Sequence, residues 1–285
     1  MYHGPTLPKS EIDSGMSAYF EDKIVIVTGA SSGIGLETAL AFARASARVV
    51  LAARTQAKLQ EVVDAHPNLR ERLRVVPADV TKDEDVRRLV ADAIAQFGRV
   101  DILVNNAGIG MRAPVAESPL DDAHCLMDVN FFGPLRCIQA VLPHMRQQGA
   151  GQIVNVGSIL SVVVATRNGV YCASKFALLA VSDTLRMELH GTGIEVISVL
   201  PAYTDTPFFD NMYRYGNVAR MSPFPGQHPA KVARAILRGC ARHKRQVVLT
   251  VSSRLAIWLK RCSPRLLDFI VRQTGQRAAK AESKA

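Results

Sequence analysis

The chain has 285 residues, of which 48% are hydrophobic and 21% charged, a composition ordinary for a globular protein. No stretch reaches the ~18 uninterrupted apolar residues that a membrane-spanning helix needs, and the first twenty residues contain acidic side chains and no apolar run. We therefore expect a soluble, cytoplasmic protein without a secretory signal. The five cysteines form no CxxC pair and no metal-ligand spacing, so we expect reduced thiols and no metal site.

Along the chain, short apolar runs alternate with segments of helical length. The first run is KIVIV at 23–27, and similar runs recur as ARVVLAAR, RLRVVPADV, VDILVNNAG, GQIVNVGS and GIEVISVLP, with QVVLTV as the last. Continuous apolar strands separated by helices indicate a parallel sheet that is covered on both faces. We predict one doubly wound α/β domain of the Rossmann type over residues 21–251, preceded by a flexible arm at residues 1–20.

A glycine-rich turn, TGASSGIG at 28–35, follows the first apolar run. Its three glycines would let backbone amides approach a pyrophosphate at the start of the next helix. The spacing differs from the better-known G-x-G-x-x-G fingerprint, but strand, turn and helix follow one another in the order that a dinucleotide site requires. We predict that this turn binds the cofactor through Gly29, Ser31, Ser32, Gly33, Ile34 and Gly35.

The second apolar run ends at Arg54, with no carboxylate beside it. A carboxylate at this place would accept a hydrogen bond from the ribose 2′-hydroxyl of NAD, whereas an arginine accommodates the 2′-phosphate of NADP. A solvated arginine is the simpler alternative. Because Arg54 follows the glycine turn at the right distance, the sequence favours NADP(H) over NAD(H).

The segment YCASK at 171–175 places Tyr171 and Lys175 one helical turn apart, so their side chains share a face. A phenol is a poor base near its usual pKa of ~10, and a neighbouring ammonium would lower that pKa. Ser158 follows another apolar strand at its carboxyl end, where open α/β sheets bind their ligands. We predict that Tyr171 transfers the proton and that Ser158 hydrogen-bonds the substrate oxygen, although a helix cap is the alternative role for this serine.

Taken together, the motifs resemble the short-chain dehydrogenase/reductase family over about residues 22–205. The resemblance implies a catalytic tetrad of Asn130, Ser158, Tyr171 and Lys175, in which Asn130 positions a water that links Lys175 to solvent. The motifs that carry it stand in the family's order: TGASSGIG at 28–35, Asp79 in ADV, NNAG at 105–108, Asn130 in DVNFFG, Ser158, and YCASK at 171–175.

The same resemblance implies further cofactor contacts. Asp79 and Val80 would lie at the adenine, and Asn106, Ala107 and Gly108 along the adenosine side. Pro201, Thr204 and Thr206 would lie at the nicotinamide amide, and Tyr171 with Lys175 at the ribose. A polar turn is the plain alternative for NNAG, and a helix cap for Asp79. One departure is Ala202, which stands where the family usually has glycine.

The implied activity is hydride transfer between NADP(H) and a carbonyl or secondary alcohol, in a homodimer or homotetramer without a nucleic-acid partner. Residues 203–227 stand where the family has its substrate lid, and an aromatic lining favours a lipophilic substrate such as a steroid, retinoid, acyl chain or aromatic ketone. Packing of the rings onto the domain is the alternative. The residues concerned are Phe208, Phe209, Tyr213, Tyr215 and Phe224, with an apolar wall at Leu160 and residues 162–164. The rival function is a non-catalytic NADP(H)-binding sensor or a membrane-surface scaffold.

The net charge of +10 is concentrated at the C-terminus, where residues 231–285 hold fourteen Lys and Arg against two acids. We predict two short basic helices in the extension 252–285, divided at Ser263 and Pro264 and ending at Gly275. We favour packing of their apolar face on the body. The alternatives are peripheral contact with an anionic membrane and binding of a polyanion, for which no recognition motif is present. The apolar residues are Leu255, Trp258, Leu259, Cys262, Leu266, Phe269 and Ile270.

Overall fold

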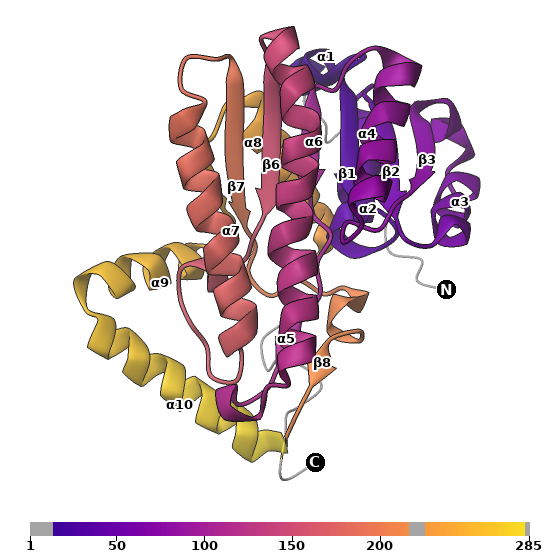
Figure 1. Ribbon diagram of the computed structural model, residues 1–285. Coiled ribbons are helices and arrows are strands. Elements are labelled where there is room, and N and C mark those ends of the chain that lie inside the picture. Colours follow the sequence, from indigo (N-terminus) through magenta and orange to yellow (C-terminus); the bar gives the residue numbers. More distant parts are fainter. Residues whose placement is uncertain (1–13, 217–225, 283–285) are drawn as a thin grey trace.

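A computed structural model describes residues 14–216 and 226–282, which form a central sheet with helices on both faces (Figure 1). Seven strands make up the sheet in the order β3-β2-β1-β4-β6-β7-β9, and all neighbouring pairs are parallel. This confirms the predicted doubly wound α/β fold. The strands are β1 (Ile24–Thr28), β2 (Arg48–Ala53), β3 (Leu73–Pro77), β4 (Ile102–Asn105), β6 (Gly151–Val156), β7 (Ile194–Leu200) and β9 (Gln246–Val248).

Three helices cover each face of the sheet. Two separate apolar clusters result, one on each side, and they include residues of α2, α3 and α8 on one face and of α4, α6 and α7 on the other. Figure 1 shows the second group in front of the sheet. The six helices are α2 (Gly33–Arg44), α3 (Gln56–Asp64), α8 (Pro229–Ala241), α4 (Asp83–Phe97), α6 (Gly133–Gln148) and α7 (Gly169–Glu188).

Shorter elements complete the described chain. A second sheet pairs β5 with β8 in parallel, and a π-helical turn joins α5 to α6. The remaining elements are α1 (Ser14–Phe20), β5 (Met111–Arg112), α5 (Leu120–Met127), β8 (Tyr213–Arg214), α9 (Val251–Cys262) and α10 (Pro264–Glu282), with 3-10 turns at Pro67–Arg72, Val115–Glu117, Ile159–Ser161 and Pro207–Phe209 and the π turn at Asp128–Phe132.

The central strands are mainly apolar because both of their faces are buried. In β1, Val25 and Val27 belong to the core beneath α2 and α8, whereas Ile26 points into the core beneath α4 and α6. Strand side chains alternate between faces, so a strand covered on both sides needs apolar residues at every position. The strand order reverses between β1 and β4, and in such sheets this switch point opens a crevice at the carboxyl ends of the strands.

The arm predicted at residues 1–20 is wrong for its last part. Residues 1–13 lie outside the described residues, but Ser14–Phe20 form helix α1. Phe20 is fully buried and its ring lies edge-on to that of Phe42, with centroids 5.1 Å apart. Met16 and Tyr19 also pack against this core. Three contacts within one short helix of 7 residues are too few to form a recognisable apolar period.

The C-terminal extension also differs from the prediction in two respects. Helix α10 does not end at Gly275 but continues to Glu282, since an interior glycine costs a helix only about 1 kcal/mol and alanines follow it. The expected packing of the apolar face on the body is wrong for Leu255 and Trp258, which are both 58% exposed. The boundary between α9 and α10 lies at Ser263 and Pro264.

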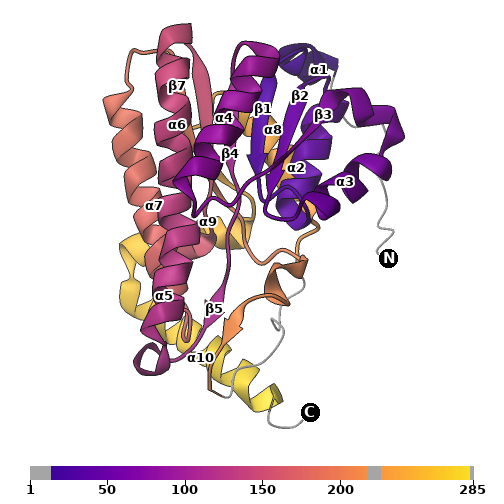
Figure 2. The ribbon, with the colours of Figure 1, turned by 45° about the vertical axis from the view of Figure 1, so that its right-hand side comes forward.

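One helical segment, Leu120–Gln148, is long and apolar enough by composition to cross a membrane. It comprises α5, the π turn and α6, and it lies along the sheet (Figure 2). Cys137, Val141 and Met145 of α6 are buried in the core beneath it. A core helix of a globular domain has the same composition, and the packing favours that interpretation.

The burial of Phe20 leads to a stability prediction. Phe20→Ala should lower the free energy of unfolding by about 3–5 kcal/mol, because it removes a fully buried aromatic ring and leaves a cavity beside Phe42. Urea denaturation followed by circular dichroism measures the change. Glu21→Ala, at an exposed neighbour, should stay within about 0.5 kcal/mol of wild type. An equally small effect at Phe20 would show that α1 is not part of the core.

Candidate active site

The glycine turn lies where β1 enters α2, and its backbone needs glycine at two positions. Gly29 and Gly33 have positive φ angles of 65° and 56°, a region that side chains other than glycine rarely adopt. Gly35 is needed for space, because a Cβ there would lie 2.2 Å from the Gly29 carbonyl oxygen. Ser32 is the N-cap of α2, so the free amides of the first helical turn sit beside the turn. This bare backbone next to a helix N-terminus fits a dinucleotide pyrophosphate.

Two polar side chains fasten the glycine turn to the end of β4. The buried Thr28 hydroxyl accepts hydrogen bonds from the backbone amides of Asn106 (3.0 Å) and Ala107 (3.1 Å). Asn106 Nδ2 donates to the Thr28 carbonyl oxygen at 3.0 Å. The predicted cofactor residues Asn106 and Ala107 therefore lie directly beside Gly29, where an added Cβ would be 2.9 Å from the Ala107 Cα.

Ser158 and Tyr171 meet at the carboxyl end of the sheet. Ser158 follows β6, and its side chain hydrogen-bonds the phenol of Tyr171, which lies in the first turn of α7. Its Oγ also accepts from the Leu160 amide at 3.1 Å, so the serine caps a 3-10 turn as well. The cap that was the alternative role for this serine is therefore present, and the capping bond fixes the hydroxyl next to the phenol.

Lys175 lies below Tyr171 on the same face of α7. Its Nζ is 5.8 Å from the Tyr171 ring centroid and donates to the Val156 carbonyl oxygen at 3.3 Å. The side chain is buried, and that burial lowers the pKa of Lys175 to about 8 because the ammonium loses its hydration. The sequence places an ammonium here, and the fold brings it under the tyrosine.

The pKa of Tyr171 differs from the prediction. Burial raises the pKa of Tyr171 to about 12, and the hydrogen bond from Ser158 opposes this only in part. The spacing of the two residues predicts that the ammonium of Lys175 lowers it. In the structure the ammonium lies under the ring and donates to a backbone carbonyl, and burial of the phenol sets the direction of the shift. The phenol therefore retains its proton at neutral pH.

Asn130 occupies the π-helical turn and is completely buried. Its Oδ1 accepts from the Ile109 amide at 2.8 Å, and its Nδ2 donates to the Ile109 carbonyl oxygen at 2.9 Å and to Ser174 Oγ at 3.1 Å. A Cβ on Gly108 would lie 3.1 Å from Asn130 Oδ1 and 3.6 Å from Lys175 Nζ, so these groups meet at Gly108. The amide of Asn130 thus holds the segment after β4 against α7, beside Lys175.

The remaining predicted residues of the adenosine side lie at the ends of β2 and β3. Arg54 directly follows β2 and is exposed. Asp79 follows β3, and its Oδ1 accepts from the amide and hydroxyl of Thr81 at 3.0 and 2.8 Å. This is a local turn and not the helix cap that was the alternative for Asp79. Val80 is buried against Gly133, where an added Cβ would lie 2.8 Å from Val80 Cγ2.

On the opposite side of the cleft, the segment after β7 reaches back to the glycine turn. A Cβ on Gly33 would lie 3.0 Å from Thr206 Cγ2, which places Thr206 beside the predicted pyrophosphate site. Thr204 is buried, and its hydroxyl donates to the Ala202 carbonyl oxygen at 2.9 Å. The Pro201 carbonyl oxygen accepts from the amide of Ile159 at 2.8 Å, which ties this segment to the residue after Ser158.

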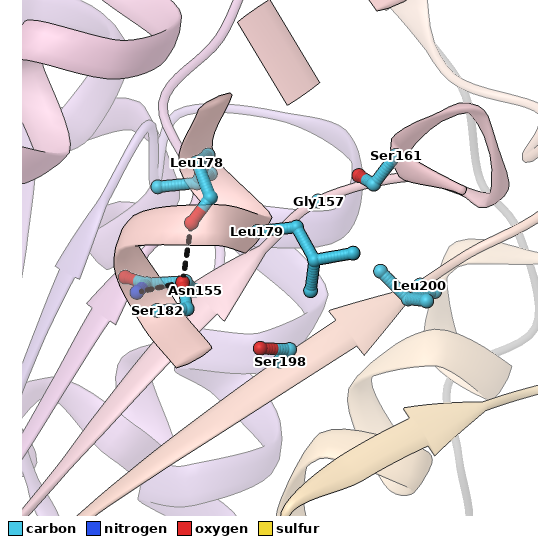
Figure 3. A pocket seen from close by; sticks show the side chains of 8 residues that line it. All are labelled: Asn155, Gly157, Ser161, Leu178, Leu179, Ser182, Ser198 and Leu200. Carbon is cyan, nitrogen blue, oxygen red and sulfur yellow. Dashed lines mark hydrogen bonds between the residues drawn. The ribbon is translucent and has the colours of Figure 1, made fainter. Parts of the chain in front are cut away.

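A buried polar chain behind the site escaped the sequence prediction. Asn105 Nδ2 donates to Asn155 Oδ1 at 2.9 Å, and Asn155 Nδ2 donates to Ser182 Oγ at 2.8 Å. Ser182 Oγ in turn donates to the Leu178 carbonyl oxygen at 2.6 Å (Figure 3). These bonds join β4 and β6 to α7, the helix that carries Tyr171. The available signal was an asparagine inside each of two otherwise apolar runs.

Figure 3 also shows a small gap between α7 and strands β6 and β7, which these hydrogen-bonded side chains border. It has no room for even a water molecule (about 0 Å³), whereas ligand pockets begin at ~300 Å³. It is a packing gap behind Ser158 and not the substrate site. The lining residues are Asn155, Gly157, Ser161, Leu178, Leu179, Ser182, Ser198 and Leu200.

The described part of the predicted lid, residues 203–216, places aromatic rings over the site. The ring centroid of Phe208 is 6.0 Å from that of Tyr171, and the Phe209 ring packs against both Phe208 and Tyr203. The Tyr215 hydroxyl hydrogen-bonds Asp122 on α5. Phe224 lies outside the described residues.

Strand β8 holds the lid segment by pairing with β5, and Tyr213 and Tyr215 join a small apolar cluster there. Beyond Ser158, Val163 is buried whereas Val164 is 52% exposed, so the predicted apolar wall turns outward within one residue. Some rings of the segment therefore pack onto the domain, while Phe208 lies over the phenol. The packing alternative is thus confirmed for Tyr213 and Tyr215, and a substrate role for Phe208 stays a prediction.

The buried ammonium gives a prediction about stability and pH. Lowering a lysine pKa from 10.5 to about 8 corresponds to roughly 3 kcal/mol of unfavourable burial. Between these pH values the unfolded chain binds more protons than the folded chain, so the wild type gains stability as pH rises. Lys175→Met removes this dependence. The free energy of unfolding of the wild type, relative to that of the variant, should therefore rise by about 2–3 kcal/mol from pH 7 to pH 10.

Urea titrations at several pH values measure that difference. Lys58→Met, at an exposed position on α3, serves as the matched control and should show no such change. A constant difference between Lys175→Met and wild type would mean that the ammonium is not buried.

The chain is similar to known proteins over most of its length. A family model described as short chain dehydrogenase matches residues 23–215, which is more than half of the chain. The chain is 34% identical to "Dehydrogenase/reductase SDR family member 7B" of Danio rerio over 273 residues, covering 90% of this chain and 88% of that protein.

Solved structures agree. A short chain dehydrogenase/reductase from Burkholderia phymatum in complex with NAD superposes with a TM-score of 0.78 at 25% identity, covering 87% of this chain and 95% of that one. A short chain dehydrogenase from Burkholderia cenocepacia in complex with NADP gives 0.76 at 28% identity, covering 88% and 98%. The chain therefore belongs to the short-chain dehydrogenase/reductase family of oxidoreductases, whose fold binds a nicotinamide cofactor.

Proposed function

We propose that the protein transfers a hydride between NADP(H) and a carbonyl or secondary alcohol carbon. The observation that carries this proposal is the Tyr171 phenol, hydrogen-bonded to Ser158 and above the buried Lys175 ammonium, whose Nζ lies near Gly108. The four residues come from three segments that meet at one end of the sheet: Asn130 from the π turn, Ser158 from the end of β6, and Tyr171 with Lys175 from α7. Bound NADP(H) supplies or accepts the hydride, and the protein's own residues handle the oxygen and its proton.

The direction of proton transfer follows from the environment of the phenol. A phenol is protonated at neutral pH and burial raises the pKa of Tyr171 further, so in reduction it donates its proton to the substrate oxygen as the carbon receives hydride. The hydroxyls of Ser158 and Tyr171, already hydrogen-bonded to each other, are the two donors that would hold that oxygen. Lys175 lies close enough for its ammonium to stabilise the phenolate left behind. In oxidation the same groups work in reverse.

Arg54 supports NADP(H) as the preferred cofactor. It is exposed directly after β2, and its neighbours Ala53 and Thr55 carry no carboxylate. A guanidinium can pair with the 2′-phosphate that distinguishes NADP from NAD. The related structures described above contain either cofactor, so the preference rests on this residue.

The substrate we infer is lipophilic, because Phe208 lies 6.0 Å from the reactive phenol ring. An aromatic side chain next to two hydroxyl donors suits an apolar molecule with one polar oxygen, such as a steroid, retinoid, acyl or aromatic ketone. Family members often form oligomers, and we infer a homodimer or homotetramer through the long helices. The five free thiols suit a reducing compartment, so we infer a cytoplasmic location.

A screen of lipophilic ketones with NADPH, followed by absorbance of the reduced nicotinamide, tests the activity. With an active ketone, Tyr171→Phe should lower kcat at least about 100-fold, because a general acid contributes 10²–10⁴-fold. NADPH affinity, measured by fluorescence titration, should be unchanged. Tyr19→Phe, on α1 away from the site, should behave as wild type. Retained turnover in Tyr171→Phe would refute the role, and NADPH binding without turnover on any ketone would favour the sensor.

Cofactor preference gives a separate test. Arg54→Asp should raise KM for NADPH at least about tenfold, which corresponds to 1.4 kcal/mol, because a carboxylate repels the 2′-phosphate. KM for NADH should stay the same or fall. Arg146→Asp, an equal charge change on the exposed side of α6, is the control and should alter neither value. A parallel change in both cofactors would mean that Arg54 does not contact the ribose.

A further inference from the structure

Helix α9 turns an apolar stripe away from the protein. Val251, Leu255 and Trp258 are 81%, 58% and 58% exposed, and their spacing of four and three residues puts them on one face. The opposite face carries Ser253, which is buried, and Lys260, whose ammonium donates a hydrogen bond to the Val162 carbonyl oxygen. A surface helix normally turns its apolar stripe inward, so this orientation is inverted.

Helix α10 repeats the arrangement. Leu267 is only 8% exposed, whereas Leu266, Phe269 and Ile270 are 48%, 59% and 42% exposed. Together α9 and α10 present six large exposed apolar residues within one stretch of twenty residues. Exposed apolar groups gathered in this way mark an interaction surface. The six residues are Val251, Leu255, Trp258, Leu266, Phe269 and Ile270.

The segment that carries this apolar surface is strongly basic. In residues 226–273 the sequence has eleven Lys and Arg against one acid, Asp268. Arg254 links α9 to the body by donating to the Val248 carbonyl oxygen at 3.3 Å. It also borders a hollow of about 630 Å³ between α8, β9 and α9. The basic residues that line this hollow are Lys231, Arg234, Arg238, Arg242, Lys244 and Arg254.

The two helices lie at the end of the sheet that carries the candidate active site. Figures 1 and 2 both show α9 and α10 outside the helical layers, at the end where the strands finish. Lys260 fixes α9 to this end: besides its bond to Val162, its Nζ lies 4.7 Å from the ring centroid of Phe176 on α7. Val162 follows Ser158 by four residues, so a partner bound to α9 would lie close to the site.

We propose that α9, α10 and the basic hollow dock the protein on an anionic phospholipid bilayer. Exposed aromatic and aliphatic side chains enter the boundary between headgroups and acyl chains, while the surrounding cations attract anionic lipids. A second copy of the chain suits the surface less well, because a twofold contact would bring the same cations face to face. If the proposed function also holds, a lipophilic substrate would reach Tyr171 from the bilayer, but the docking does not depend on it.

Flotation of the full-length protein with vesicles tests the proposal. Protein should float with vesicles that contain phosphatidylserine, less so at high salt, and should stay unbound with pure phosphatidylcholine. Trp258→Ser combined with Phe269→Ser should lower the partition coefficient at least about tenfold, since both side chains leave the apolar boundary. Arg261→Gln combined with Arg265→Gln should lower it by about fivefold per charge, the equivalent of ~1 kcal/mol for each cation.

Matched controls change exposed apolar and basic side chains elsewhere in the protein. Val115→Ser with Met187→Ser removes two exposed apolar side chains from other elements, and Arg87→Gln with Arg146→Gln removes two distant charges. Both should float as the wild type does. Tyr171→Phe should also float, which separates docking from catalysis.

Two results would overturn the proposal. One is wild-type protein that does not float with anionic vesicles. The other is flotation that the Trp258 and Phe269 substitutions leave unchanged. If these substitutions instead lowered the molar mass measured by light scattering in vesicle-free solution, and no flotation occurred, the surface would be an interface between copies of the chain.

Discussion

The contact between the ends of β1 and β4 is the constraint on which the site depends. The Thr28 hydroxyl accepts two backbone amides of the segment after β4, and Asn106 returns a hydrogen bond to the Thr28 carbonyl. This pulls the two strand ends together at the point where the strand order reverses. The approach is so close that Gly29 and Gly35 have no room for a side chain. The glycine turn is therefore shaped by what lies beside it, and the fold provides a bare backbone surface for a phosphate group.

Much of the fold could be predicted because its strands are buried on both sides. Continuous apolar runs, as in β1 and β6, indicate a covered parallel sheet without any tertiary information. The errors occurred in short or terminal segments that lack a long apolar period. The buried ring of Phe20 attaches α1 to the core together with Met16 and Tyr19, and α10 continues past Gly275 because one interior glycine costs a helix little.

The site could be predicted as a set of residues but not as an electrostatic environment. Spacing places Lys175 under Tyr171, and the structure agrees. Spacing does not say how much water surrounds the two groups. Burial raises the pKa of the phenol and lowers that of the ammonium, so the proton rests on Tyr171. Likewise, the pairing of Asn155 with Ser182 depends on which strand and helix become neighbours, and a sequence pattern does not contain that.

The π-helical turn at Asp128–Phe132 limits how this chain can change length. A π-helical turn is one residue wider than an α-helical turn. Asn130 lies at its centre and makes three hydrogen bonds to two other segments. Each residue added to or removed from a helix rotates everything beyond it by about 100°. A deletion anywhere between α5 and α6 would swing that amide out of the interior while leaving a continuous helix. Length variants that keep the helix intact would thus lose the anchor beside Lys175, so insertions and deletions in this family member should be confined to its loops.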